Sequence, residues 1–127
     1  MRASAALAVV AVVASVAAFA VAQGAGAAST PKLIGVVGKN GAFTITLKNT
    51  RGKVVRTLAA GTYTIVVRDY SKFHNFELER EHGGKGRDIT DVDFVGTKTV
   101  RMKLTRGEYK VYCDPHESSM FQNFAVR

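Results

Sequence analysis

The stretch that decides the fold reads Thr97-Lys98-Thr99-Val100-Arg101-Met102-Lys103-Leu104, then Thr105-Arg106-Gly107, then Glu108-Tyr109-Lys110-Val111-Tyr112-Cys113. Apolar residues stand at every second position on both sides of the turn. This spacing is typical of two β-strands that each bury one face. Arg101 and Lys103 stand between these apolar residues, so we expect the bases to form a solvated strand face.

The same alternation continues through the rest of the chain, and no stretch shows a sustained helical period. Further strands are predicted at residues 33–37, 43–47, 54–58, 62–68, 76–79 and 121–126, with an Asn-Gly turn at residues 39–41. Residues 80–93 are polar and glycine-bearing, which indicates an exposed loop. About seven or eight short strands in one domain predict an all-β fold, a β-sandwich with Greek-key connections.

The first part of the chain does not resemble a domain. Residues 3–22 are almost wholly Ala and Val, Arg2 precedes them, and small residues follow. This pattern predicts a secretory signal peptide over residues 1–27 and a domain over residues 28–127. An uncleaved anchor is the alternative, because the apolar run is about long enough to cross a bilayer. Either reading places the domain in the periplasm, outside the cell or on the outer side of the cytoplasmic membrane.

Cys113 is the only cysteine, so the domain cannot form an internal disulfide in a compartment that would permit one. It opens the run Cys113-Asp114-Pro115-His116-Glu117-Ser118-Ser119-Met120, which places a thiolate, an imidazole and a thioether in one loop. His74, after the predicted strand 62–68, supplies a second imidazole. Two His, one Cys and a weak axial Met are the ligands of a blue-copper centre. We therefore predict one copper bound by His74, Cys113, His116 and Met120.

Residues 61–126 resemble the cupredoxins, in particular the small plastocyanin- and amicyanin-like proteins. The likeness lies in His74-Asn75-Phe76, Phe94-Val95-Gly96-Thr97, Gly107-Glu108-Tyr109 and the loop from Cys113 to Met120. It implies that Asn75 donates its backbone N–H to the Cys113 sulfur and pairs its side chain with Asp114. Pro115 stiffens the loop and has no N–H to donate.

The chain departs from the family pattern at two points. The spacing from His116 to Met120 is one residue shorter than in plastocyanin, and Gln122 stands where many relatives carry Gly. These departures leave the ligand assignment in place. They bear on the distance from copper to Met120, and hence on the reduction potential.

These residues favour a one-electron carrier that is not an enzyme, because they include no acid, base or open coordination position for chemistry on a substrate. A multicopper oxidase or nitrite reductase needs more histidines, including one next to the ligand Cys, where this chain has Asp114. An extracytoplasmic copper-binding carrier or buffer without a dedicated electron-transfer role is the alternative. His82 has no partner ligand at a metal-binding spacing and is expected in an exposed loop.

The expected partner is a redox protein that approaches an electron-transfer surface made of His116, Tyr112 and Phe121. Tyr112 is either a partner-facing aromatic or a packed surface residue. Removing residues 1–27 removes one base and no acid, so the net charge falls from eight positive charges to seven. A basic surface favours acidic partners or anionic lipid surfaces. No nucleic-acid recognition motif accompanies the bases, membrane association would follow only from an uncleaved N-terminal segment, and we expect a monomer.

Overall fold

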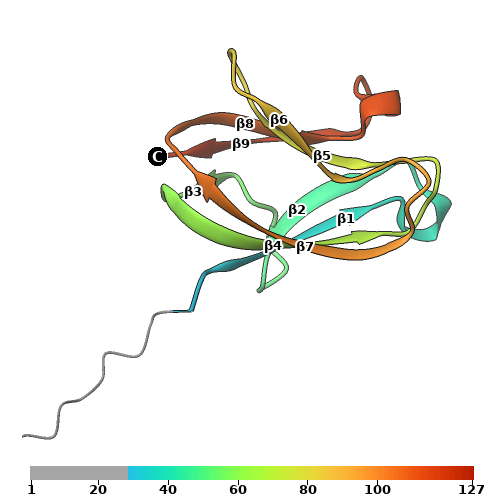
Figure 1. The fold of residues 1–127 in the computed structure, drawn as a ribbon, viewed down its shortest axis with the longest axis horizontal. Helices are drawn as coiled ribbons and strands as arrows, with labels where there is room; N and C mark the ends of the chain where they lie inside the picture. Colours follow the sequence, from blue (N-terminus) through green and yellow to red (C-terminus); the bar gives the residue numbers. More distant parts are fainter. Residues whose placement is uncertain (1–28) are drawn as a thin grey trace, which may run out of the picture.

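The computed structural model describes residues 29–127, so the predicted signal peptide lies outside the described residues. Within this part of the chain, no helix has the length and apolar character to cross a membrane. The described residues form nine strands in two sheets that lie face to face (Figure 1). The sequence therefore predicted the all-β sandwich correctly.

The four-stranded sheet has the order β2-β1-β4-β7. Its strands are β1 (Lys32–Val37), β2 (Ile45–Asn49), β4 (Gly61–Asp69) and β7 (Gly96–Leu104). β1 pairs antiparallel with β2 and parallel with β4, and β4 pairs antiparallel with β7 along its whole length. Alternate residues of β1, β2 and β4 are buried, and the inner face of β7 at the sheet edge is half-buried except for the buried Leu104, which is why the sequence shows a period of two.

The five-stranded sheet has the order β3-β9-β8-β5-β6. Its strands are β3 (Thr57–Leu58), β5 (Phe76–Arg80), β6 (Gly86–Thr90), β8 (Gly107–Tyr112) and β9 (Phe121–Val126). The chain leaves the four-stranded sheet after β4, forms the β5–β6 hairpin in the other sheet, and returns as β7 beside β4. The connections β4–β5 and β8–β9 end at the same end of the sandwich, and they carry the predicted copper ligands.

The core lies between the two sheets. Its largest fully buried side chains include Phe76, Leu47, Ile65, Leu78 and Leu104. Phe76 packs directly beneath β1, because a Cβ added at Gly35 would lie 2.7 Å from the tip of its ring. The strand after His74 is thus fixed by core packing.

The prediction of an exposed loop over residues 80–93 is wrong. Residues 86–90 form strand β6, which pairs antiparallel with β5 at the edge of the sheet. Ile89 and Thr90 are buried at its end, while the first three residues of the strand are exposed. With one apolar residue at a core position, the strand shows no alternation that the sequence could reveal. The turn before it, which contains His82, is exposed as expected.

Candidate metal centre

The loop between β8 and β9 is closed by its own backbone hydrogen bonds. Its first residues, Asp114–His116, form a single 3-10 turn with Pro115 at the start. The N–H of Cys113 donates to the carbonyl of Met120 at 3.0 Å, and the N–H of Met120 donates to the carbonyl of His116 at 2.8 Å. These bonds fix three of the predicted ligands relative to one another.

His74 comes from the connection between β4 and β5. It is 2% exposed, and its N–H donates to the carbonyl of Ser71 at 3.3 Å. Gly38, at the end of β1, approaches from the other side with a φ of 68°. A Cβ there would lie 2.7 Å from the Ser71 side chain and 3.0 Å from the His74 ring. Only glycine suits both this backbone conformation and this contact.

A buried carboxyl group supports the same connection. Asp69, at the end of β4, accepts hydrogen bonds from the Ser71 N–H at 3.1 Å and from the Thr90 hydroxyl at 2.7 Å. The Phe76 N–H in turn donates to Thr90 Oγ1 at 2.9 Å. Burial raises the pKa of Asp69, against the hydrogen bonds of Thr90 and Ser71 and the charge of His74. The network ties the two ends of the His74 connection to β6.

The two imidazoles and the thiol converge on one point. Nδ1 of His74 lies 3.2 Å from Nδ1 of His116, and the Cys113 Sγ lies 3.7 Å and 3.6 Å from these two atoms. The centre of such a triangle is ~2.0 Å from each corner, close to the usual lengths of metal–nitrogen and metal–thiolate bonds. His74, Cys113 and His116 therefore form the ligand set of a type 1 copper site.

The surroundings of Cys113 act on its sulfur in two directions. Burial raises the pKa of the Cys113 thiol, while the backbone N–H groups of Asn75 and His116 act to lower it. The Asn75 side chain accepts a hydrogen bond from the Asp114 N–H at 2.7 Å and donates to Asp88 at 3.4 Å. Asn75 thus joins the two ligand connections.

Burial, then the charge of His116, lowers the pKa of His74. The lowered pKa favours the neutral imidazole that binds a metal.

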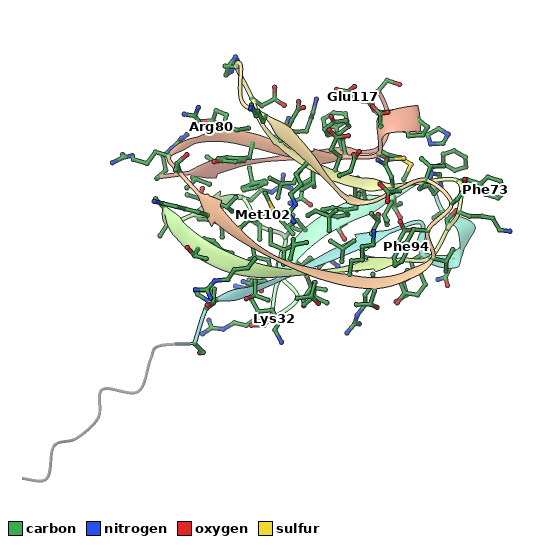
Figure 2. All side chains as sticks on the ribbon, in the orientation of Figure 1. Lys32, Phe73, Arg80, Phe94, Met102 and Glu117 are labelled. Atoms are coloured by element: carbon green, nitrogen blue, oxygen red, sulfur yellow. The ribbon has the colours of Figure 1, made fainter. Side chains whose placement is uncertain are left out.

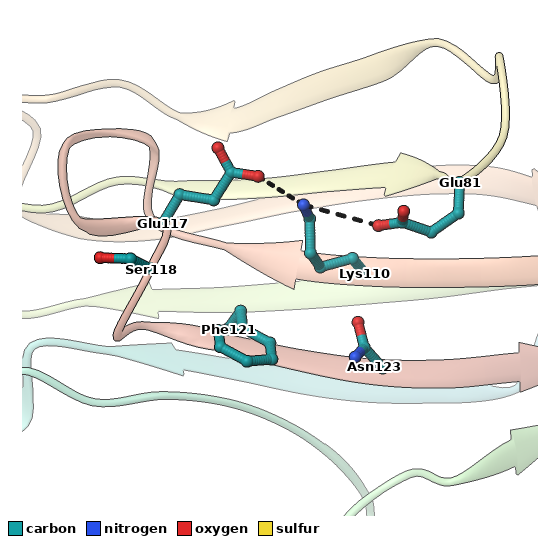
Figure 3. Close-up of a pocket in the computed structure, with 6 residues that line it drawn as sticks. All are labelled: Glu81, Lys110, Glu117, Ser118, Phe121 and Asn123. Atoms are coloured by element: carbon teal, nitrogen blue, oxygen red, sulfur yellow. Dashed lines mark hydrogen bonds and ion pairs between the residues drawn. The ribbon is translucent and has the colours of Figure 1, made fainter.

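The other predicted residues fall into two groups. Met120 is 1% exposed at the base of the loop, whereas Pro115 is exposed on its outside. Phe121 is 48% exposed and lines a pocket on the outer face of the five-stranded sheet (Figure 3). Tyr112 is only 6% exposed. Its burial fits a packed residue rather than a partner-facing one.

Neighbouring charges cover Tyr112. Its hydroxyl donates to Glu79 at 3.1 Å, and the Lys110 ammonium lies 4.6 Å from the centre of its ring. Lys110 also contacts Glu81 and Glu117 across the pocket (Figure 3). Burial, followed by the hydrogen bonds and charges of Glu77 and Glu79, raises the pKa of Tyr112.

Phe43 belongs to the site but could not be identified from the sequence. Its ring meets the rings of His74 and His116 edge to face, with 4.9 Å between centroids in both cases. It is also 61% exposed. In the sequence, Phe43 looks like the first residue of a strand, but the strand begins at Ile45, so its side chain is free to turn toward the histidines.

No protein-family model matches the chain, and no curated protein does. Among solved structures, reduced rusticyanin at 1.9 Å resolution has a TM-score of 0.57 and 17% identity over 76% of this chain and 78% of its own. Rusticyanin from Thiobacillus ferrooxidans at 1.27 Å has a TM-score of 0.54 and 18% identity over 76% of both chains. The chain has the cupredoxin fold. In this fold, the ligand triangle lies at one end of the sandwich, where the two ligand connections meet.

Proposed function

We propose that the protein is an exported type 1 copper protein that carries single electrons between redox partners. The observation that carries the proposal is the triangle of His74 Nδ1, His116 Nδ1 and Cys113 Sγ, whose size suits one metal ion. Copper bound there would supply a centre that alternates between Cu(I) and Cu(II). We assign Met120 as the weak axial ligand, because it is buried at the base of the same loop.

The residues around the triangle would keep the ligands fixed during electron transfer. Asn75 and Asp114 join the two connections by a 2.7 Å hydrogen bond, and Pro115 restricts the turn before His116. His74, Cys113 and Met120 are buried, so a metal held there would be covered on all sides except that of His116. This arrangement supports an electron carrier rather than an enzyme.

The electron would pass through the exposed edge of the site. His116 is half-buried, and the exposed Phe43 ring lies against it. These two residues and Pro115 form a small apolar contact area suited to brief docking of a redox protein. We keep Phe121 at the margin of this area and leave Tyr112 out of it, because Tyr112 is covered by its neighbours.

An absorption spectrum of the purified protein with one equivalent of Cu(II) tests the proposal. A strong visible band from the thiolate–copper bond is expected, because Cys113 must bind as the thiolate. Cys113→Ser should abolish the band and His116→Ala should weaken or shift it. His82→Asn is the matched control, since His82 is exposed in the β5–β6 turn and should leave the band unchanged. A colourless wild-type protein would refute the assignment.

A copper carrier or buffer would have to release its metal. We expect the blue protein to be reduced and reoxidised repeatedly in the presence of a Cu(I) chelator without losing colour, because three of the four proposed ligands are buried. Loss of copper to the chelator after the first reduction would favour the carrier or buffer instead.

A further inference from the structure

The outer face of the four-stranded sheet is strongly basic. It consists of the residues of β1, β2, β4 and β7 that point away from the core, as the alternating burial shows. Its bases are Lys32, Lys48, Arg68, Arg101 and Lys103, and the other positions are Ile34, Val36, Val66 and five threonines. None of these outward positions on the four strands carries an acid. We call this surface the basic face.

The strand register shows how the basic face is laid out. Ile34 lies between Lys48 on β2 and Val66 on β4, and Val36 lies beside Arg68. Lys32 and Arg101 lie in the next row, on either side of Thr64. Four bases therefore surround a small apolar centre of Ile34, Val36 and Val66, all of which are partly exposed.

A cluster of acidic residues lies on the opposite side of the sandwich. Glu79, Glu81 and Glu117 surround Lys110 on the outside of the five-stranded sheet. In Figure 2, Glu117 projects above that sheet and Lys32 lies below the four-stranded one. The basic face thus carries five bases and no acid, whereas three glutamates meet one lysine on the opposite side, so an anionic surface would attract the first and repel the second.

We propose that the basic face binds an anionic lipid bilayer. Charge complementarity supports this occupant, since each Lys or Arg close to such a surface contributes to attraction. The apolar centre has only short β-branched side chains and no aromatic anchor of the kind that dominates protein interfaces. The long Lys and Arg side chains can reach past it to lipid phosphates. The inference goes beyond the proposed function and does not depend on copper. It replaces the expectation from the sequence that only an uncleaved N-terminal segment would bring the protein to a membrane.

This orientation would leave the metal end accessible. The ligand loop belongs to the far sheet and lies at the end of the sandwich (Figure 1). With the basic face on a bilayer, the end of the sandwich that carries the ligand loop would lie beside the membrane surface rather than in it. The protein could then meet partners held in the same membrane while it moves over the surface.

Vesicle sedimentation of the protein with residues 1–127 present tests the proposal. Binding is measured to vesicles of phosphatidylcholine alone and to vesicles containing phosphatidylglycerol. An apolar N-terminal segment would bind both kinds alike, so the readout is the ratio of the two partition coefficients. We expect a ratio well above one at 0.1 M salt that falls toward one at high salt.

The double variant Arg68→Gln/Arg101→Gln should lower that ratio by about 25-fold, or about five-fold for each base removed. Arg87→Gln/Arg106→Gln is the matched control, because it removes the same charge from exposed positions outside the basic face. Equal losses in the two variants, or a ratio of one for the wild type, would overturn the proposal. A third outcome is that the protein binds polyglutamate but not anionic vesicles, and that the Arg68→Gln/Arg101→Gln variant loses this binding. That outcome would also overturn the proposal, because it assigns the basic face to an acidic protein partner. The blue band is recorded for every variant, so a failure of the copper assignment is seen separately.

Discussion

At the scale of single residues, the orientation of each side chain determines whether the metal site can form. Both histidines direct Nδ1 at the thiol, and the buried Met120 belongs to a loop whose backbone bonds hold it against Cys113. The sequence spacing predicted all four as ligands, and the structure brings His74, Cys113 and His116 together. The spacing could not identify Phe43 or Asp69, because a ring edge and a buried carboxyl acquire their roles only through contacts between distant segments.

Met120→Leu should leave the protein blue and raise its reduction potential. Leu offers Cu(II) no thioether, so the oxidised form loses more stabilisation than the reduced form. A tenfold change in relative affinity for the two oxidation states corresponds to about 59 mV, and we expect a rise of this order by cyclic voltammetry. Met102→Leu, on β7, is the control and should leave the potential unchanged. An unchanged potential in Met120→Leu would remove Met120 from the metal site.

At the scale of elements, Gln122 explains why this chain can depart from the Gly of many relatives. It is 8% exposed on β9, and its side chain reaches the other sheet. Its amide oxygen accepts from the Leu47 N–H at 2.8 Å, and its amide nitrogen donates to the carbonyls of Leu47 at 3.1 Å and Val55 at 2.9 Å. Gln122 thus joins β9 to β2 and to the segment before β3.

Gln122→Met should reduce the free energy of unfolding by about 2 to 4 kcal/mol. The substitution keeps the volume but leaves buried backbone groups of Leu47 and Val55 without partners, and each such group costs about 1–3 kcal/mol. Urea unfolding followed by circular dichroism measures the change. Asn123→Met, on the exposed side of the same strand, should change stability by less than about 0.5 kcal/mol. Similar losses in both variants would show that the side-chain bridge contributes nothing.

Strand prediction succeeded where apolar residues recur along the element and failed where they are confined to one end. β4, β7, β8 and β9 alternate clearly, and their bounds agree with the expected ones to within one residue. β6 is recognised only through its pairing with β5, and β3 is two residues long rather than five. Edge strands depend on a neighbour for their hydrogen bonds, so their own sequence contains little of the signal.

At the scale of the whole molecule, the metal site should add to stability without being needed for folding. The core between the sheets is continuous, and the ligand loop is closed by protein hydrogen bonds alone. The copper-free protein should therefore unfold cooperatively. Free copper at 100 times its dissociation constant should raise the free energy of unfolding by about 2.7 kcal/mol.

Thermal unfolding by circular dichroism, with and without metal, measures this increment. His116→Ala should lose most of the increment while the copper-free melting temperature changes little, since His116 is half-buried outside the core. A copper-free protein without a cooperative transition would contradict the prediction.

The separation of charge onto opposite faces also bears on how copies of the chain meet one another. A two-fold pair formed through either sheet face would bring bases against bases or acids against acids. A basic face is complementary only to the far side of the next copy, which is a head-to-tail contact that does not close on itself. At low ionic strength such copies would stack in open rows, and salt would disperse them because the attraction acts across exposed, screened charges. On one anionic surface, however, all copies would turn the basic face toward that surface. Neighbouring copies would then lie side by side with like charges at the same height, and their mutual repulsion would keep them apart as separate molecules.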